Sequence, residues 1–313
     1  MKSRRARRQV RTALLFLTPW LVGVVVLQAY PILMTVYYAF TNFDGISFPP
    51  HFVGFANFIQ AFHYSAYFIP AVLNTLWWVG ISVPVTTVVG LALALALNSS
   101  RRGMGTFRTL FFLPSMVPSV AAGILFAWVF NPVSGPVNAI LGMVGVPGPD
   151  WFISPHWAKV GLLLLTIWQV GPTMIIFLSG LQAVPKDLIE AATLEGAGAL
   201  RRFRSVVLPL LTPTVFFNLI LGFIGAFSLF TQAVVVSGAS GASAASSNAS
   251  LGGPNNSMLF YAVDMYRVIF NQLEFGYGSA LSLLLTLTIA VVAALLFATA
   301  RKWVFYGGRS ERA

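Results

Sequence analysis

The sequence predicts an all-α integral membrane protein with six transmembrane helices and with both termini in the cytoplasm. Three observations support this prediction. Hydrophobic residues make up 57% of the 313-residue chain and charged residues only 9%, whereas soluble proteins average about 45–50% apolar and about 25% charged residues. The apolar residues gather in six long runs, and the few cations gather in short clusters between those runs.

Each of the six apolar runs is long enough to cross a bilayer as a helix. Such a helix needs about 20 apolar residues to span a hydrocarbon core of about 30 Å. The predicted spans are residues 13–38, 71–97, 109–130, 160–181, 210–236 and 280–300. All but the last contain proline, which membrane helices tolerate when neighbouring groups bond the freed carbonyl.

Lysine and arginine set the predicted orientation, because short cytoplasmic segments of membrane proteins are enriched in them. All but two of the 19 such residues lie near the termini or in the second and fourth connections, and the exceptions are Lys159 and Arg267. We therefore expect a basic cytoplasmic N-terminus at residues 1–12, a transmembrane domain at 13–303 and a cytoplasmic tail at 304–313. The first apolar run is too long for a secretory signal peptide, so it is predicted to be an uncleaved span.

The net charge of +11 does not indicate nucleic-acid binding, since the cations follow the membrane topology. The expected surroundings are lipid, and no nucleic-acid partner is predicted.

The predicted spans contain no Asp, Glu, Lys, Arg or His away from their ends. Ion-coupled transporters usually place ionisable groups at that depth, so the chain shows no energy source of its own. It has no Gly-Lys pair, which excludes a Walker A loop. It has no cysteine, and His51, His63 and His156 lack metal-ligand spacing. We therefore predict that it is not an enzyme and binds no metal or cofactor itself.

The connection at residues 185–209 is unusually polar for this chain. Pro185 can begin a helix, with Asp187 and Glu190 in its early turns near the positive end of the helix dipole. Gly196 permits a sharp change of direction. The basic piece that follows is predicted to be a second helix that ends at Pro209.

Lipid and protein are the two candidate partners of this connection. A basic segment on anionic lipid would explain its arginines. It would not explain Ala191 and Ala192 flanked by Glu190 and Glu195, because anionic head groups repel acids and small residues favour close packing. We therefore predict a protein partner.

The same connection resembles the cytoplasmic loop of binding-protein-dependent ATP-binding cassette (ABC) importers. In that family Glu-Ala-Ala is followed after three residues by Gly and, after nine more, by an aliphatic residue and then x-Leu-Pro. The matching residues are Glu190, Ala191, Ala192, Gly196, Val206, Leu208 and Pro209. Val206 replaces the usual Ile, and Glu195 stands where Asp commonly precedes the Gly. Further segments at 52–58, 73–98, 107–120, 252–256 and 275–282 are similar to carbohydrate permeases of the maltose and glycerol-phosphate type.

The resemblance implies a type I ABC importer permease fold in the cell inner membrane. It implies that the loop is a coupling helix for an ATPase subunit, through Glu190, Ala191, Ala192, Glu195, Gly196, Ala197, Leu208 and Pro209. The implied partners are a second, related but different permease chain, two copies of an ABC ATPase, and an extracytoplasmic solute-binding protein. ATP and Mg would be used by the ATPase.

A sugar pathway should be lined by hydroxyls, amides and aromatic faces. The candidates are Trp168, Gln169 and Thr173 on the fourth span and Ser228, Thr231 and Gln232 on the fifth. Hydrogen bonding between helices is the alternative role of such side chains. A low-complexity stretch within residues 237–257 is predicted to be a flexible outer insertion.

The predicted function is therefore inward transport of a sugar or sugar-like solute, driven by ATP hydrolysis on separate subunits through the 185–209 loop. Two alternatives stay open at this point: an ATP-independent facilitator or secondary carrier, and a scaffold or sensor subunit without a transport role.

Overall fold

The computed structural model describes residues 2–99, 101–239 and 251–305. Within these ranges the chain is helical and forms no strand, apart from one isolated antiparallel bridge between Thr41 and Phe52. This confirms the predicted all-α class. Most of the predicted insertion (240–250) and of the predicted tail (306–313) lies outside the described residues.

Four helical stretches are long and apolar enough to cross a membrane, and six are if each of two bent helix pairs counts as one span. The four are Gln9–Ala39, Phe68–Leu97, Ala199–Phe227 and Phe275–Trp303. The bent pairs are Met104–Met116 with Ser119–Val129, and Pro155–Trp168 with Gly171–Gln182. The higher number equals the predicted one.

The chain divides into two compact units, the first of which comprises residues 1–65 and 265–286. Its helical elements are α1 (Lys2–Val24), a π-helical turn (Val25–Ala29), α2 (Tyr30–Ala39), α3 (Ala56–Ile59), two further π-helical turns (Gln60–Tyr64 and Arg267–Asn271) and the beginning of α15 (Phe275–Trp303). Within the first unit, as far as its residues are described, no residue in the most apolar window of Gln9–Ala39 is buried.

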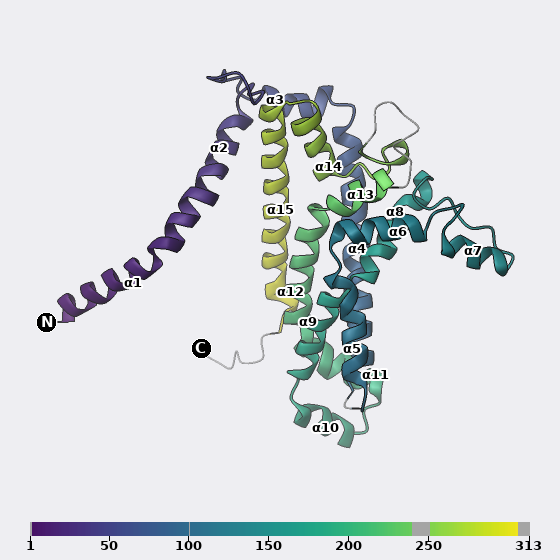
Figure 1. Ribbon diagram of the computed structural model, residues 1–313. Coiled ribbons are helices and arrows are strands. Elements are labelled where there is room, and N and C mark those ends of the chain that lie inside the picture. Colours follow the sequence, from purple (N-terminus) through teal and green to yellow (C-terminus); the bar gives the residue numbers. More distant parts are fainter. Residues whose placement is uncertain (1, 100, 240–250, 306–313) are drawn as a thin grey trace. The chain divides into compact units, whose positions relative to one another are not determined.

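The second unit comprises residues 66–264 and 287–313. Its helices are α4 (Phe68–Leu97), α5 (Met104–Phe112), α6 (Ser119–Val129), α7 (Pro136–Met143), α8 (Pro155–Trp168), α9 (Gly171–Gln182), α10 (Lys186–Leu194), α11 (Ala199–Arg202), α12 (Leu208–Phe227), α13 (Thr231–Ala239), most of α14 (Tyr261–Tyr266) and the end of α15. Figure 1 shows α4, α9 and α12 side by side, with α10 at their lower end.

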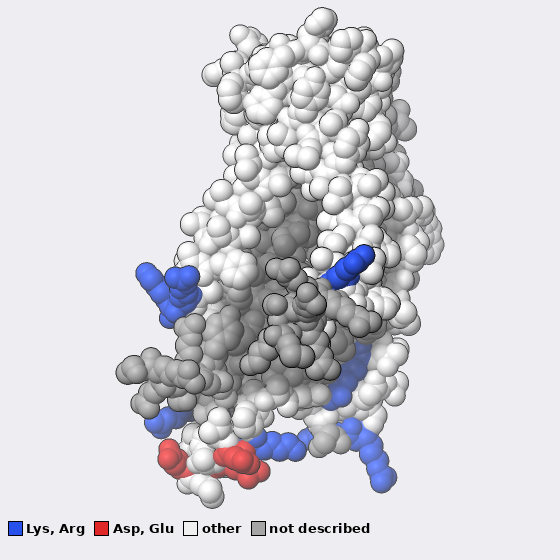
Figure 2. All heavy atoms as spheres, turned by 90° about the vertical axis from the view of Figure 1, so that its left-hand side faces the viewer, with Lys and Arg blue, Asp and Glu red and all other residues white. Residues whose placement is uncertain are grey.

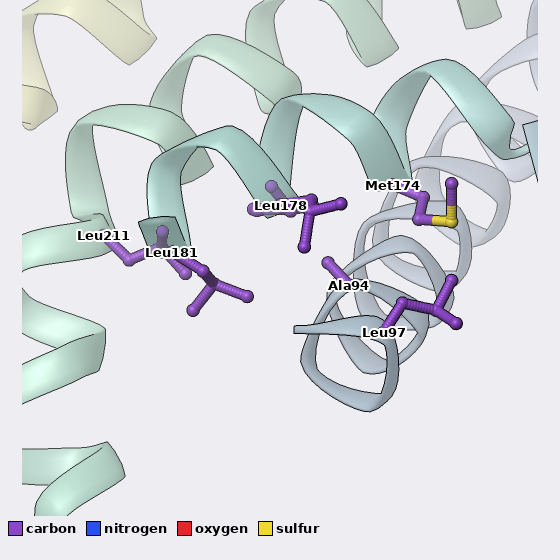
Figure 3. Close-up of a cluster of buried hydrophobic side chains, with 7 residues drawn as sticks. Ala94, Leu97, Met174, Leu178, Leu181 and Leu211 are labelled. Atoms are coloured by element: carbon purple, nitrogen blue, oxygen red, sulfur yellow. The ribbon is translucent and has the colours of Figure 1, made fainter. Parts of the chain in front are cut away.

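The core of the second unit lies where α4, α9 and α12 meet. Figure 3 shows side chains from these three helices pointing toward one another. The cluster consists of Ala94, Leu97, Met174, Phe177, Leu178, Leu181 and Leu211, all buried. The cluster joins the three helices by close packing of apolar side chains, as expected where lipid provides little hydrophobic driving force between helices.

The segment predicted as a single span at 109–130 is instead a pair of helices bent by 97°. Val117, between them, is extended at ψ 125°, and Pro118 precedes the first residue of α6. The cause is local, because a proline ring disfavours the helical conformation of the residue before it.

The predicted span at 160–181 is bent by 46° between α8 and α9. Gly171 and Pro172 begin α9. A Cβ at Gly171 would lie 2.9 Å from the Phe112 Cα and 3.0 Å from the Phe111 carbonyl oxygen. Only glycine allows the bent chain to approach α5 so closely.

The predicted span at 210–236 differs at both ends. Its helix begins earlier, because α11 continues through a π-helical turn at Phe203–Val207 into α12 and does not end at Pro209 as predicted. The N–H of Leu208 donates to the Phe203 carbonyl, five residues back, and this wider turn accommodates the ring of Pro209. The helix then ends at Phe227, and α13 begins at Thr231.

Candidate functional site

Two features of the second unit contain most of the predicted site residues. They are an exposed short helix, α10, and a polar cavity among α4, α8, α12 and their neighbours. Figure 2 shows acidic side chains gathered at the lower end of the view, beside basic ones, at the height where α10 lies in Figure 1. Glu190, Ala191 and Glu195 are exposed, and Leu194 exposes 90% of its surface. Among the described residues, no hydrogen bond or ion pair engages the Glu190 carboxylate.

The end of α10 is fixed by backbone geometry at Gly196. This residue has φ +80°, a conformation that costs other residues about 1–2 kcal/mol. The Gly196 N–H donates to the Thr193 carbonyl at 3.0 Å, and the Ala197 N–H donates to the Ala192 carbonyl at 3.0 Å. Together they form a Schellman motif. The interval between Ala192 and Gly196 in the sequence pattern is therefore the interval that this helix cap requires.

The basic piece after the bend is tied back to α10. The Arg202 guanidinium donates to the Thr193 hydroxyl at 2.6 Å, and that hydroxyl donates to the Ile189 carbonyl at 2.7 Å. Because α11 continues into α12, the Arg202–Thr193 hydrogen bond attaches α10 directly to the span that contains α12. Leu208 and Pro209 lie half-buried in the first turn of α12. They are therefore part of this attachment, whereas the other six predicted coupling residues lie on α10 and its cap.

The second feature is a cavity of about 280 Å³ within the second unit. It is lined by Gln169, Thr173, Ser228, Thr231 and Gln232, five of the six predicted pathway residues, together with Trp78, Ser82, Thr86, Thr166 and several apolar residues. No charged side chain belongs to this lining as the described residues form it.

Breaks in two helices place most of these polar groups. Gln169 lies in the break between α8 and α9, and Ser228 in the break between α12 and α13. At each break, one helix presents its last carbonyls and the next presents its first N–H groups. Irregular backbone at membrane depth is tolerated only inside protein or along a water-filled cavity. The cavity therefore explains how the two helix breaks are tolerated, and the breaks explain why polar groups line the cavity.

Interhelical hydrogen bonding explains only part of the polar lining. Gln169 Nε2 donates to the Val117 carbonyl at 3.3 Å, which joins two helix breaks. Thr166 and Thr86 donate to carbonyls of their own helices. Among the described residues, the side chains of Ser228, Thr231 and Gln232 make no hydrogen bond, so they are available to a ligand.

The structure places Trp168 apart from the other five predicted pathway residues. Its ring packs against Phe126, with 5.3 Å between the ring centroids, and it does not line the cavity. Sequence reasoning missed Trp78, Ser82 and Thr86 on α4. Their spacing of four residues within an apolar run puts them on one helix face, a signal that was present in the sequence.

Charged groups lie outside the cavity. In the first unit, the Asp44 carboxylate accepts hydrogen bonds from the Ser47 and Ile46 N–H groups and from the Ser47 hydroxyl. These bonds, the Ser47 N–H first, lower the pKa of Asp44 to about 2. This acid therefore stays ionised as part of a loop turn. The described residues include no group of three acids or histidines able to hold a metal ion.

The cap geometry predicts different outcomes for two neighbouring glycines. A Cβ would meet open space at both Gly196 and Gly198, but only Gly196 has a positive φ, since Gly198 has φ −65°. Gly196→Ala should therefore speed hydrogen exchange of the Gly196 and Ala197 amides about fivefold to tenfold, as expected for about 1 kcal/mol of strain. Gly198→Ala should leave their exchange unchanged. Equal effects from the two substitutions would disprove the cap.

The chain is similar in sequence to known transporter permeases. The chain is 32% identical over 312 residues to the probable ABC transporter permease protein YesP of Bacillus subtilis (strain 168), covering 99% of this chain and 97% of that protein. It is 33% identical over 287 residues to the sulfoquinovosyl glycerol transport system permease protein SmoG of Agrobacterium fabrum, covering 91% and 89%.

A solved structure shares the fold. A chain of a bacterial ABC transporter involved in the import of the acidic polysaccharide alginate superposes with a TM-score of 0.81 at 18% identity, covering 96% of this chain and 99% of that chain. Residues 86–304 match the family described as "Binding-protein-dependent transport system inner membrane component". This protein is therefore a member of that family of ABC transporter permeases.

Proposed function

We propose that this chain is the permease subunit of an importer that moves a sugar or sugar-like solute into the cell, powered by ATP hydrolysis on separate subunits. The observation on which the proposal chiefly rests is α10, a rigid, capped helix that presents an unpartnered acid and bare apolar side chains to solvent. A helix of this kind is suited to docking against another protein. An ATP-independent facilitator would have no need of it.

In this proposal α10 docks in the ATPase. Glu190 supplies a charge that a basic residue of the ATPase can pair, and Ala191 allows close approach because it has almost no side chain. The Schellman cap and the Arg202–Thr193 hydrogen bond hold α10 in place relative to α11 when the ATPase pulls on it. ATP and Mg act on the ATPase, and two copies of it would serve this chain and a second, related permease chain.

The cavity is the proposed place of the solute. Hydroxyl and amide side chains both donate and accept hydrogen bonds, as do the hydroxyls of a sugar. The helix breaks add further donors and acceptors. Trp78 offers an apolar face of the kind on which a sugar ring packs.

The remaining partners follow from the proposed topology. With both termini cytoplasmic, the connections that carry Asp44 and Asp150 face outward, where a solute-binding protein would deliver its cargo. The uncovered face of Gln9–Ala39 suits lipid or the second permease chain. The importer would thus reside in the cell inner membrane.

The docking role of Glu190 can be tested by charge reversal. Glu190→Lys should lower ATP-driven uptake by the complete importer at least about tenfold, because it opposes like charges at the proposed interface. The measurement is uptake, together with solute-stimulated ATPase activity, in proteoliposomes. The amount of this chain in the membrane should not change, since the Glu190 side chain makes no hydrogen bond or ion pair within the described part of the chain.

Lys302→Glu is the matched control, since it also reverses an exposed charge on the predicted cytoplasmic side, but at the end of α15 and outside α10 and its cap. It should leave solute-stimulated ATPase activity within about twofold of wild type, as expected for an isolated surface charge. Normal stimulation with Glu190→Lys would remove Glu190 from the interface.

The role of the cavity can be tested with its two glutamines. The double substitution Gln169→Ala and Gln232→Ala should lower uptake about tenfold, since each glutamine would contribute a hydrogen bond of about 0.5–1.5 kcal/mol to the solute. Trp168→Phe, outside the cavity, should have little effect. Unchanged uptake and specificity in the double variant would show that the solute passes elsewhere.

A further inference from the structure

Lys159 is the only lysine or arginine in the predicted outward connections of the second unit. It lies on the first turns of α8 and reaches across to α4. Its Nζ donates to the Asn74 Oδ1 at 2.7 Å and lies 4.7 Å from the centre of the Trp77 ring. Among the described residues it has no carboxylate partner. An amide and an aromatic face therefore hold this cation in place of an acid.

Asn74 is the junction through which Lys159 acts. Its Nδ2 donates to the Asn256 carbonyl at 2.8 Å and to the Leu259 carbonyl at 3.0 Å. An ammonium group can only donate, so Lys159 fixes Oδ1 toward itself and Nδ2 toward the two carbonyls. A charge on the acceptor side also polarises the amide and strengthens the bonds that it donates.

The segment that Asn74 holds has three further contacts with α4, one of which is the Tyr261 ring against Phe68 with 5.8 Å between centroids. The N–H of Tyr261 donates to the Thr75 hydroxyl at 2.8 Å, and the Phe260 ring packs against Trp78 with 5.7 Å between centroids. Met258, Leu259 and Phe260 are almost completely buried. Residues 256–261, here called the outer strap, therefore lie along α4 between Phe68 and Trp78.

Trp78 connects the outer strap to the cavity. It lines the cavity, exposes only 2% of its surface and contacts Phe260. Asn74 and Thr75 lie one turn before it on α4, in the direction that the proposed topology places outside. The strap thus backs the cavity wall at its outer end.

We propose that Lys159 and Asn74 form a releasable lock that keeps the outer strap and Trp78 closed over the outer end of the solute cavity. The proposal rests on the proposed importer function, in which the cavity must be shut from outside while it is open to the cytoplasm. It makes Lys159 a positioning residue for transport, one that acts through Asn74 without touching the solute.

The chemistry of the contact suits repeated opening. Breaking a buried ion pair leaves an uncompensated charge inside the protein. A lysine held by a neutral amide and a ring can instead swing its ammonium group into water on its flexible stem. Asn74 is half-buried, so its freed amide oxygen can bond water instead.

The absence of cysteine from this chain permits a direct test. In the complete importer, Ser82→Cys places a thiol in the cavity lining, where the side chain is 3% exposed. Its labelling rate by a membrane-impermeant thiol reagent added from outside, in the absence of ATP, reports how often the outer end opens. Adding Lys159→Met should raise this rate about tenfold, the effect of losing one charge-assisted hydrogen bond.

Three further variants make the test specific. Lys159→Arg keeps a cationic donor and should restore slow labelling. Asn74→Asp keeps the Lys159 contact but loses both hydrogen bonds to the strap, so the thiol of Ser82→Cys should be labelled fast in this variant. If Lys159→Met does not assemble, the result for Asn74→Asp decides between the outcomes. Lys302→Met removes an exposed lysine from the last turn of α15, outside both α10 and the strap, and should leave the rate unchanged.

Labelling at the parent rate in both Lys159→Met and Asn74→Asp would overturn the lock, as would equal acceleration by Lys302→Met. The importer function is tested separately, by ATP-driven uptake in the parent complex. Normal uptake with unchanged labelling rejects the lock alone, and absence of ATP-driven uptake from the unmodified complex rejects the proposed function.

Discussion

The need to satisfy every backbone hydrogen-bonding group inside a membrane governs this structure. A continuous helix meets that need by itself, and a broken helix meets it only where protein or water takes over. The second unit breaks α8 from α9 at Gln169 and α12 from α13 at Ser228, and both breaks line one cavity. The freed backbone groups and the neighbouring polar side chains then form a surface that can bind a hydroxylated solute. The cavity is thus a consequence of where the helices stop.

The helices that stop at the cavity also lead to α10. The segment α9 begins at Gly171 beside the cavity and ends three residues before α10, while the helix from Ala199 to Phe227 runs from the α10 bend back to the cavity. Between these ends, α9, α12 and α4 share the cluster of Phe177 and Leu211. A movement imposed on α10 therefore has two packed helices along which to reach the helix breaks. In the proposed importer, these helices connect α10, where the ATPase would act, to the cavity, where the solute would bind.

The sequence predicted the class, the number of spans and the position of α10, because apolar runs and turn residues are local signals. It predicted five residues of the cavity lining, since polar side chains within apolar spans are conspicuous. It did not predict the breaks. Pro118 and Gly171 mark two of them in hindsight, but Pro84 and Pro213 lie inside helices that continue, so proline alone does not decide. The break at Ser228 contains neither proline nor glycine and depends on tertiary packing. The contact of Trp168 with Phe126 was not predicted, because its orientation depends on the bend one residue later.

The most direct test of this account is a cysteine scan of the helix breaks in the assembled complex, in membranes. Single cysteines at Gln169, Ser228 and Gln232, and at Leu164 and Ile175 on the outer surfaces of α8 and α9, would be compared by their reaction with a small water-soluble thiol reagent. The account predicts that the three cavity positions react, because they face water at membrane depth, and that a bound solute slows them. The two surface positions should stay unreactive. Unreactive cysteines at all three cavity positions, or equal reaction at all five, would contradict the claim that the helix breaks line a water-filled solute cavity.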